Sequence, residues 1–364
     1  MTGKLLRAVC AGAVLALAAT GCASGGSPAN TPAAVAAALP SFGPAEKTTL
    51  NVGAVPAMDS AGFFVALNQH LFAKEGLTIN YAPAVSSETA VQQQLKGELD
   101  ISAGNYVSYI NEVAVDHEPL EVVAEGSIMT PGSQVIYTAA GSPIKTVGAL
   151  KGRTIAVNAP NNIDYLLDVS VLSGYGISPS QVKFPAQPLN FPEIAPDVLA
   201  KGSQYAAATL PEPFASLAQQ SDGMVPLVDL DQGAVESFPI EGYVVTKQWA
   251  KQNPNTLKRF LAALEEGQEI ADTQRSAVEN AFEDIRGPGG STLPENAIPY
   301  GWVTSTIASV MALNTYPIGV DETRIQRVAN VMHQFGLLKA PFNVSAMIMP
   351  TTQFDFSPFT KTGS

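Results

Sequence analysis

Residues Leu50–Ile79, LNVGAVPAMDSAGFFVALNQHLFAKEGLTI, decide the fold of this chain. The stretch predicts a buried strand, a turn of small residues, an amphipathic helix, a glycine stop at Gly76 and a second strand. Apolar residues recur at helical spacing at Phe63, Phe64, Leu67 and Leu71. Asp59 and Ser60 lie in the turn, where the start of a helix leaves backbone N–H groups free. In an open α/β sheet such a turn is at the carboxyl end of a strand, which is where ligands bind.

The same alternation continues along the chain. In the first part we expect a helix at Ser87–Lys96 and further strands at Leu77–Tyr81, Asp100–Ala103 and Glu121–Ala124. A second α/β unit begins near Pro143, with expected strands at Thr154–Val157, Ala206–Leu210 and Val225–Leu230. Strands that alternate with helices form mostly parallel sheets flanked by helices. The sequence therefore predicts an α/β fold.

The length predicts two lobes. About 320 residues follow the N-terminal segments, which is enough for two domains. We expect the chain to cross between them at Gln134–Thr138 and at Tyr243–Thr246, and two crossings make a hinge. The first lobe would then comprise residues 47–138 and 244–348, and the second residues 139–243. A C-terminal tail would cover 349–364.

The N-terminus has the pattern of a secretory signal. Lys4 and Arg7 precede the uncharged apolar run Ala8–Ala19, which is too short to span a bilayer, since that needs about 20 residues. We expect a signal peptide at 1–21 and a flexible tether at 22–46, because that stretch is rich in Ala, Ser, Gly and Pro. Cys22 follows Gly21, and no cysteine occurs after it.

Several motifs together resemble the solute-binding proteins of ABC importers, in the nitrate, sulfonate, taurine and thiamine-pyrimidine-precursor branch. The opening stretch resembles the start of those proteins, and ALKGRTIAVNAPNN (149–162) resembles the start of their second lobe. LPEPF (210–214) resembles a strand end of the family that carries an acidic and an apolar residue. The segment GSQYAAA (202–208) departs from the family pattern. The N-terminus resembles a bacterial lipoprotein signal in which Cys22 is acylated, with Ala19 in place of the usual leucine.

This resemblance implies a two-lobed periplasmic-binding-protein-like fold of type II, joined by two crossing segments. It also implies a monomer that captures a small molecule and delivers it to an ABC permease with a cytoplasmic ATPase. The protein would be extracytoplasmic, held at the outer face of the bacterial cytoplasmic membrane by the acyl chains, such as palmitate, on Cys22.

Composition and motifs argue against other chemistry. The net charge of −12 and the lack of basic clusters argue against binding to nucleic acid. The three histidines are scattered, and no HExxH, Walker-type or GxSxG motif occurs. We therefore expect no catalytic residue, metal or cofactor. The thiamine-pyrimidine synthases, which resemble this branch, remain an enzyme alternative, although they carry a cysteine-rich segment that has no counterpart here.

Candidate ligand contacts follow from strand ends and from the matched motifs. In the first lobe they are Asp59, Ser60, Asn105, Tyr106 and Ser127. In the second lobe they are Asn158, Asn161, Asn162, Glu212 and Phe214, with Tyr243 at the return crossing. Glu212 has an alternative interpretation as the N-cap carboxylate of the helix that begins near Phe214.

The candidate residues favour an amine-bearing ligand. Two are carboxylates, Asp59 and Glu212, and no candidate segment contains lysine or arginine. A buried carboxylate that receives an N–H contributes about 1.5–3 kcal/mol. An amine-bearing heteroaromatic such as an aminopyrimidine fits this set. An alkanesulfonate, taurine or nitrate is the alternative, because the helix that begins near Asn162 offers free N–H groups to an anion. A ligand sensor or partner-binding lipoprotein is a further class of function.

Overall fold

The computed structural model describes residues 42–285 and 303–350. The expected signal peptide (1–21) and Cys22 lie outside the described residues, as do most of the expected tether (22–46) and of the C-terminal tail (349–364).

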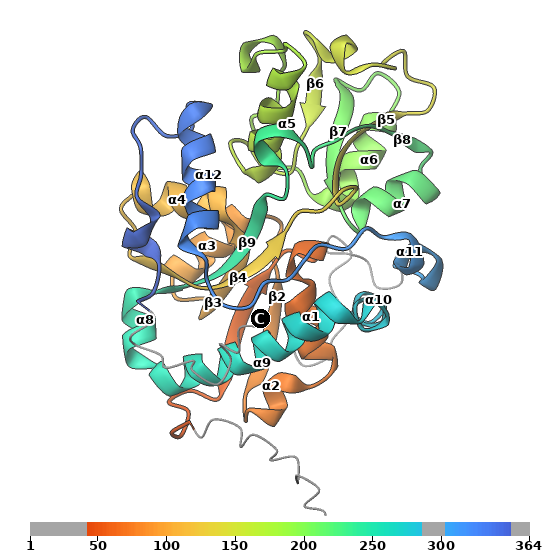
Figure 1. Ribbon diagram of the computed structural model, residues 1–364. Coiled ribbons are helices and arrows are strands. Elements are labelled where there is room, and N and C mark those ends of the chain that lie inside the picture. The colour runs from red at the N-terminus through yellow and green to blue at the C-terminus, as the bar shows by residue number, and fades with distance from the viewer. Residues whose placement is uncertain (1–41, 286–302, 351–364) are drawn as a thin grey trace, which may run out of the picture. The chain divides into compact units, whose positions relative to one another are not determined.

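The larger of two sheets has the strand order β2-β1-β3-β9-β4 (Figure 1). Its strands are β1 (Thr49–Ala54), β2 (Thr78–Pro83), β3 (Ile101–Asn105), β4 (Leu120–Ile128) and β9 (Pro239–Thr246). Strand β1 is parallel to β2 and to β3, whereas β9 is antiparallel to β3 and to β4. The one reversed strand is therefore β9, on which the chain returns from the second sheet.

The second sheet has the order β6-β7-β5-β8. Its strands are β5 (Gln134–Ala139), β6 (Thr154–Ala156), β7 (Tyr205–Pro211) and β8 (Met224–Asp229). Here β6 is parallel to β7, and β5 is antiparallel to β7 and to β8. Again the reversed strand is the one on which the chain enters. In each sheet all strands but one thus run in the same direction, and helices connect them, which confirms the predicted α/β class.

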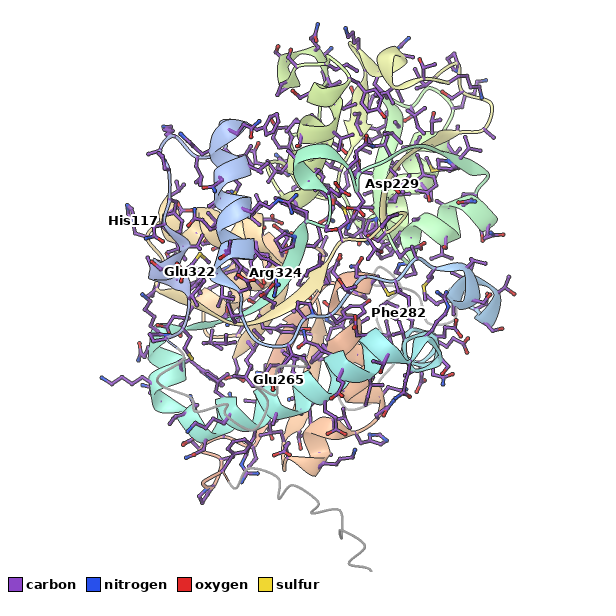
Figure 2. The ribbon with its side chains drawn as sticks, in the orientation of Figure 1. His117, Asp229, Glu265, Phe282, Glu322 and Arg324 are labelled. Atoms are coloured by element: carbon purple, nitrogen blue, oxygen red, sulfur yellow. The ribbon has the colours of Figure 1, made fainter. Side chains whose placement is uncertain are left out.

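The chain changes sheet at residues 129–133 and again at 230–238. Both passages come several residues before the expected crossings, because Gln134–Thr138 and Tyr243–Thr246 are strand residues of β5 and β9. Their apolar side chains are buried as in any core strand, so hydrophobicity alone does not mark where the chain leaves a sheet. Asp229 connects the two passages, since its carboxylate accepts a hydrogen bond from the backbone N–H of Gly132 at 2.7 Å (Figure 2).

Helices pack around both sheets. The helices between β1 and β4 along the chain are η1 (Met58–Ser60), α1 (Ala61–Asn68), α2 (Leu71–Lys74), α3 (Ser87–Leu95) and α4 (Tyr106–Ala114). Within the second unit they are η2 (Val147–Leu150), α5 (Ile163–Gly174), η3 (Pro179–Gln181), α6 (Phe191–Leu199), α7 (Phe214–Gln220) and η4 (Gly233–Val235). After β9 they are α8 (Lys247–Gln252), α9 (Pro254–Thr273), α10 (Arg275–Glu283), α11 (Ser305–Val310), α12 (Glu322–Gln334) and η6 (Val344–Met347). Within the described ranges, none of these helices combines the length and apolar character that a membrane crossing requires.

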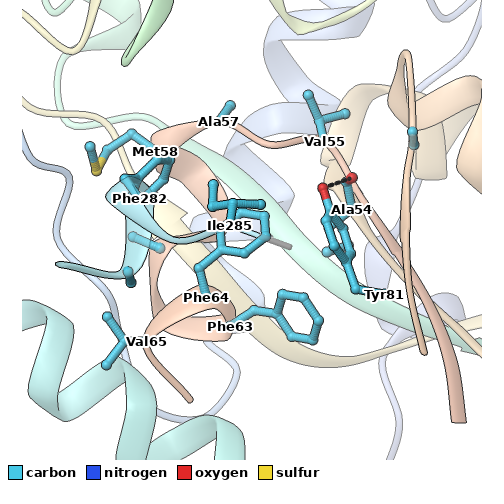
Figure 3. Packing of buried hydrophobic residues seen from close by; sticks show 14 of the residues in the cluster. Ala54, Val55, Ala57, Met58, Phe63, Phe64, Val65, Tyr81, Phe282 and Ile285 are labelled. Carbon is cyan, nitrogen blue, oxygen red and sulfur yellow. Dashed lines mark hydrogen bonds between the residues drawn. The ribbon is translucent and has the colours of Figure 1, made fainter. Parts of the chain in front are cut away.

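Aromatic packing holds α1 on the first sheet. Phe64 meets Tyr81 edge to face at 5.3 Å between ring centroids, and Phe282 at 5.5 Å (Figure 3). The Tyr81 hydroxyl donates to the carbonyl of Ala54 at 3.2 Å, so the ring also ties β2 to the end of β1. Edge-to-face pairs contribute about 0.5–1.5 kcal/mol beyond their area burial. The packing fixes α1, and with it the η1 turn that carries Asp59.

Helices α1 and α9 touch along their backbones, and glycine makes this possible. A Cβ atom added at Gly267 of α9 would lie 2.4 Å from the carbonyl oxygen of Gly62 in α1 and 2.7 Å from the Cβ of Ala66. Because these atoms belong to backbone or to a short side chain, neither can move aside without shifting a helix.

We expect Gly267→Ala to lower the free energy of unfolding by about 1–3 kcal/mol, because overpacking outweighs the helix-propensity gain of roughly 1 kcal/mol. Gly174→Ala in α5 is the matched control, since an added Cβ there meets open space. That variant should be neutral or slightly stabilised. Urea denaturation measures both, and an equal response of the two variants would contradict the close contact.

Candidate functional site

A small polar cavity lies between elements of the two sheets. Its volume is about 30 Å³, close to the space that one water molecule takes in the liquid. From the first sheet and its connections it is lined by Asp59, Ser87, Asn105 and Glu241. From the second it is lined by Asn158, Asn162, Asp164 and Phe191, among others. Residues connected with both sheets therefore contribute polar groups to one cavity.

The pairing of β9 places the first group of residues. Glu241 lies opposite Asn105 of β3 on one side and opposite Ser127 of β4 on the other. The Ser60 hydroxyl, from the turn after β1, donates to Glu241 Oε1 at 2.6 Å. The ends of β1, β3 and β4 thus lie beside β9 at Glu241.

Asp59 is held by two neutral donors. Its Oδ1 accepts from Asn314 Nδ2 at 2.8 Å and from the Ser127 hydroxyl at 3.4 Å. Burial raises the pKa of Asp59 to about 6, although these two hydrogen bonds act in the opposite direction. Burial, together with the charge of Asp59, raises the pKa of Glu241 well above its ordinary value. Two carboxyl groups therefore share one buried site, and each makes ionisation of the other harder.

Asp164 brings a third carboxyl group from the second unit. It lies in the first turn of α5, where Asn162 caps the helix by accepting from the backbone N–H of Tyr165 at 3.2 Å. Asp164 Oδ2 accepts from the backbone N–H of Asn158 at 3.3 Å. Burial raises the pKa of Asp164 to about 7. The helix N-terminus that could have received an anion already carries a carboxyl group of the protein.

No described residue that lines the cavity is a lysine, arginine or histidine. This differs from the buried Glu125 nearby, which is ion-paired with Arg324 of α12 at 2.9 Å (Figure 2). The cavity therefore offers hydrogen-bond acceptors and ionisable carboxyl groups without a compensating cation. Such a site suits a ligand that donates N–H groups or carries positive charge, and it disfavours an anion. Among residues 42–285 and 303–350, no three His, Cys, Asp or Glu side chains are grouped so as to hold a metal ion.

The structure brings six of the predicted contact residues together. Asp59, Asn105, Asn158 and Asn162 line the cavity, and Ser60 and Ser127 bind its carboxyl groups directly. Asn158 also joins the two units, because its Nδ2 donates to Val85 O at 3.0 Å and to Leu189 O at 2.7 Å.

Glu212 does not line the cavity. Its carboxylate accepts from the hydroxyl of Ser216 at 2.8 Å, from the backbone N–H of Ser216 at 3.0 Å and from that of Ala312 at 3.1 Å. Its carbonyl oxygen accepts from the backbone N–H of Met58 at 2.8 Å. The N-cap residue of α7 is Pro213, so Glu212 lies one position before it, yet its carboxylate accepts an N–H of the first turn much as a capping group does. Glu212 also links α7 to Met58 and to the segment after α11.

The remaining predicted contacts lie elsewhere. Tyr106 and Tyr243 are buried in the core: the Tyr106 ring lies against Gly242, and Tyr243 meets Phe260 at 6.3 Å. Asn161, with φ of 56°, lines a different, outer pocket beside Tyr165 and Phe335. Phe214 stacks on Phe191 at 4.9 Å and lines a neighbouring apolar pocket. Strand-end reasoning located these segments but could not tell which side chain of each turns inward.

Sequence reasoning missed Glu241, Asp164 and Asn314. Two of them carry a signal in the sequence, because Glu241 interrupts the apolar run FPIEGYVV and Asp164 falls in the largely apolar helix IDYLLDVSVL. A carboxyl group within such a run is buried and needs an explanation. Asn314 has no such signal, since it reaches Asp59 across 255 positions of the sequence.

A family model described as NMT1/THI5 like matches residues 57–274, which is more than half of the chain. The chain belongs to the NMT1/THI5-like family. This confirms the resemblance to the branch that the sequence motifs suggested. No curated protein shows a significant match to the chain in sequence.

Solved structures similar to this NMT1/THI5-like protein share its fold at low sequence identity. The alkanesulfonate-binding protein SsuA from Xanthomonas axonopodis pv. citri, bound to MOPS, has a TM-score of 0.64 and 16% identity, over 84% of this chain and 99% of that one. The periplasmic nitrate-binding protein NrtA from Synechocystis PCC 6803 has a TM-score of 0.63 and 14% identity, over 87% and 93%. The ligand-binding component of an ABC-type import system from Staphylococcus aureus, with zinc bound, has a TM-score of 0.67 and 12% identity, over 84% and 98%. These similarities confirm the expected periplasmic-binding-protein-like fold.

The raised pKa values of Asp59 and Asp164 predict a pH-dependent stability. Because both carboxyls bind protons more tightly when folded, the free energy of unfolding falls as pH rises from about 4 to 7. Asp164→Asn should reduce this loss by on the order of 2 kcal/mol. Thermal unfolding at pH 5 and pH 8 measures it, with the exposed Asp197→Asn as control. Identical pH dependence in the variant and the wild type would show that Asp164 does not titrate in this range.

The hydrogen bonds of Glu212 predict that its removal destabilises the fold. Glu212→Ala leaves the donors of Ser216 and Ala312 without their acceptor, and we expect the free energy of unfolding to fall by about 2–3 kcal/mol in the absence of ligand. Glu236→Ala, which truncates an exposed glutamate, should change it by less than about 0.5 kcal/mol. Chemical denaturation compares the two, and equal losses would refute the role of Glu212 in holding α7.

Proposed function

We propose that this NMT1/THI5-like protein is the solute-binding component of an ABC importer and that it captures a small amine-bearing molecule. The observation that carries this proposal is the cavity, whose lining includes Asp59, Asp164 and Glu241 but no lysine, arginine or histidine. The family and the fold of the import proteins named above support the importer role. An aminopyrimidine or another amine-bearing heteroaromatic would present the N–H groups that these carboxyls lack.

The energetics of the cavity favour an N–H donor over an anion. A hydrogen bond to a charged group contributes about 1.5–3 kcal/mol, and an ammonium or amidine-like group could engage two of the carboxyls. The same ligand would lower the pKa of each carboxyl, because a nearby positive charge stabilises the ionised form. Binding of a cation should therefore release protons near neutral pH. An anion would find no lysine, arginine or histidine among the residues that line the cavity.

A sulfonate or nitrate is the second candidate, and one observation favours it. The N-terminus of α5, a helix of 12 residues, faces the cavity through Asn162, and helix N-termini bind anions. The neighbours SsuA and NrtA are named for such ligands. Against this stands Asp164, whose carboxyl group occupies that helix end.

Capture would proceed without chemical change. Two hydrogen bonds join the units beside the cavity: Met58 N to Glu212 O at 2.8 Å, and Asn158 Nδ2 to Val85 O at 3.0 Å. A ligand that bridges the cavity would favour this closed arrangement over an open one by its differential contacts. The closed protein would then dock, as a monomer, on a permease driven by a cytoplasmic ATPase.

The cellular setting belongs to the same proposal. An acylated Cys22 would hold the protein at the outer face of the cytoplasmic membrane, with the tether spacing it from the bilayer. A sensor or partner-binding lipoprotein would use the same capture step and differ in what it contacts next. A thiamine-pyrimidine synthase would require a cysteine-rich segment, and no cysteine follows Cys22.

The proposal predicts that amines stabilise the protein and that sulfonates do not. A ligand at 100 times its dissociation constant adds about 2.7 kcal/mol to the stability of the folded state, which shifts Tm by several degrees. Thermal-shift measurements with aminopyrimidines, simple amines, alkanesulfonates, taurine and nitrate test this. A shift with sulfonate or nitrate alone would overturn the amine assignment.

The variant Glu241→Gln tests whether the Glu241 carboxylate binds the amine. It replaces a charge-assisted hydrogen bond with a neutral one and should weaken an amine by about tenfold or more. Glu265→Gln on α9 (Figure 2) is the matched control, because it neutralises another buried carboxyl that lies outside the cavity lining. Equal affinity of both variants for the amine would remove Glu241 from the site.

A further inference from the structure

A second, larger pocket adjoins the polar cavity. It lies between α6, α7 and the end of β7, and its volume is about 380 Å³, within the range of small-molecule sites. Its wall is formed by Phe191, Ala195, Leu210, Phe214 and Leu217, with Pro192 and Pro196 beside them. Ser221 and Asp222 form a polar rim.

The two spaces share a wall. Phe191 lines both the polar cavity and the apolar pocket, and the consecutive residues Leu210 and Pro211 line one each. Phe191 stacks almost parallel on Phe214, with ring centroids 4.9 Å apart and an interplanar angle of 13°. One aromatic side chain therefore stands between the carboxyl groups and an apolar chamber.

The polar cavity is much smaller than the apolar pocket, so different parts of a ligand would fit each of them. The polar cavity of about 30 Å³ suits a group of the size of an ammonium or an amino group. The rest of a larger ligand would need further space. The apolar pocket has more than ten times that volume, and burial of apolar surface there is favourable.

We propose that the ligand is an amphiphilic amine whose polar head binds among Asp59, Asp164 and Glu241 and whose apolar part passes Phe191 into the pocket between α6 and α7. The head-group half of this assignment rests on the proposed function, and the apolar half rests on the pocket. Phe191 would lie against the junction of the two parts, where its ring face can also attract a cationic group.

Affinity should then depend on the length of the apolar part. Each buried methylene contributes about 0.8 kcal/mol, which corresponds to a threefold to fourfold gain in affinity. The gain should begin once the chain is long enough to pass Phe191. It should stop when the pocket is filled.

Isothermal titration of the intact protein with n-alkylamines from methylamine to hexylamine tests this. We expect the dissociation constant to fall about threefold to fourfold per methylene over the longer members. Ala195→Leu fills the pocket from α6 and should abolish this gain while leaving the affinity for methylamine unchanged. Asp197→Leu is the matched control on the exposed face of the same helix and should retain the full gain.

The outcomes distinguish a failure of the apolar subsite from a failure of the amine site. Binding of short amines with no gain along the series, or a gain that persists in Ala195→Leu, would overturn the apolar subsite and leave the amine site intact. The apolar pocket would then be a surface for another occupant, such as a partner protein. Absence of any amine binding, with binding of hexanesulfonate instead, would overturn the head-group assignment.

Leu217→Gln gives a second measurement if Ala195→Leu unfolds. It places an amide of similar size on the pocket wall at a half-buried position, where the fold should tolerate it. It should reduce the gain per methylene to less than twofold. Unchanged gain in this variant would also overturn the subsite.

Discussion

The antiparallel pairing of β9 with β3 and β4 is the constraint on which the rest of the structure depends. This strand carries the chain back from the second sheet, and it enters between two strands that run the other way. Its register sets Glu241 opposite both Asn105 and Ser127. A slip of one residue would turn Glu241 to the opposite face of the sheet. The same strand therefore fixes the relation of the two sheets and the centre of the candidate site.

The buried carboxyl groups of the cavity lower the stability of the protein when no ligand is bound. Burial of several carboxyl groups without a cation is unfavourable, and the raised pKa values of Asp59 and Asp164 express that cost. Neutral donors such as Ser60, Ser127 and Asn314 reduce it, while nothing among the described lining residues supplies a positive charge. Functional sites commonly retain groups that a purely structural core would exclude, because a ligand completes their interactions. Glu125 shows the alternative, since its ion pair with Arg324 satisfies it within the protein.

The fold followed from the sequence more readily than the site did. The positions of β6, β7 and β8 agree with the expected ones to within one or two residues, because each is a short, mostly apolar run bounded by polar or turn residues. The helix expected to begin near Asn162 is α5, and Asn162 is its capping residue. The crossings were placed too late because β5 and β9 are as apolar as any core strand.

The sequence by itself determined the α/β class, the family and the segments that form the site, because these depend on local periodicity and on motifs of neighbouring residues. It also indicated an acidic site without lysine or arginine. Only the tertiary structure decided which side chains face inward. Glu212 and Glu241 are both carboxylates at strand ends, yet Glu212 binds the backbone of α7 and Ala312, and Glu241 lines the cavity. The difference arises from sheet register and from long-range partners such as Asn314, which local sequence does not encode.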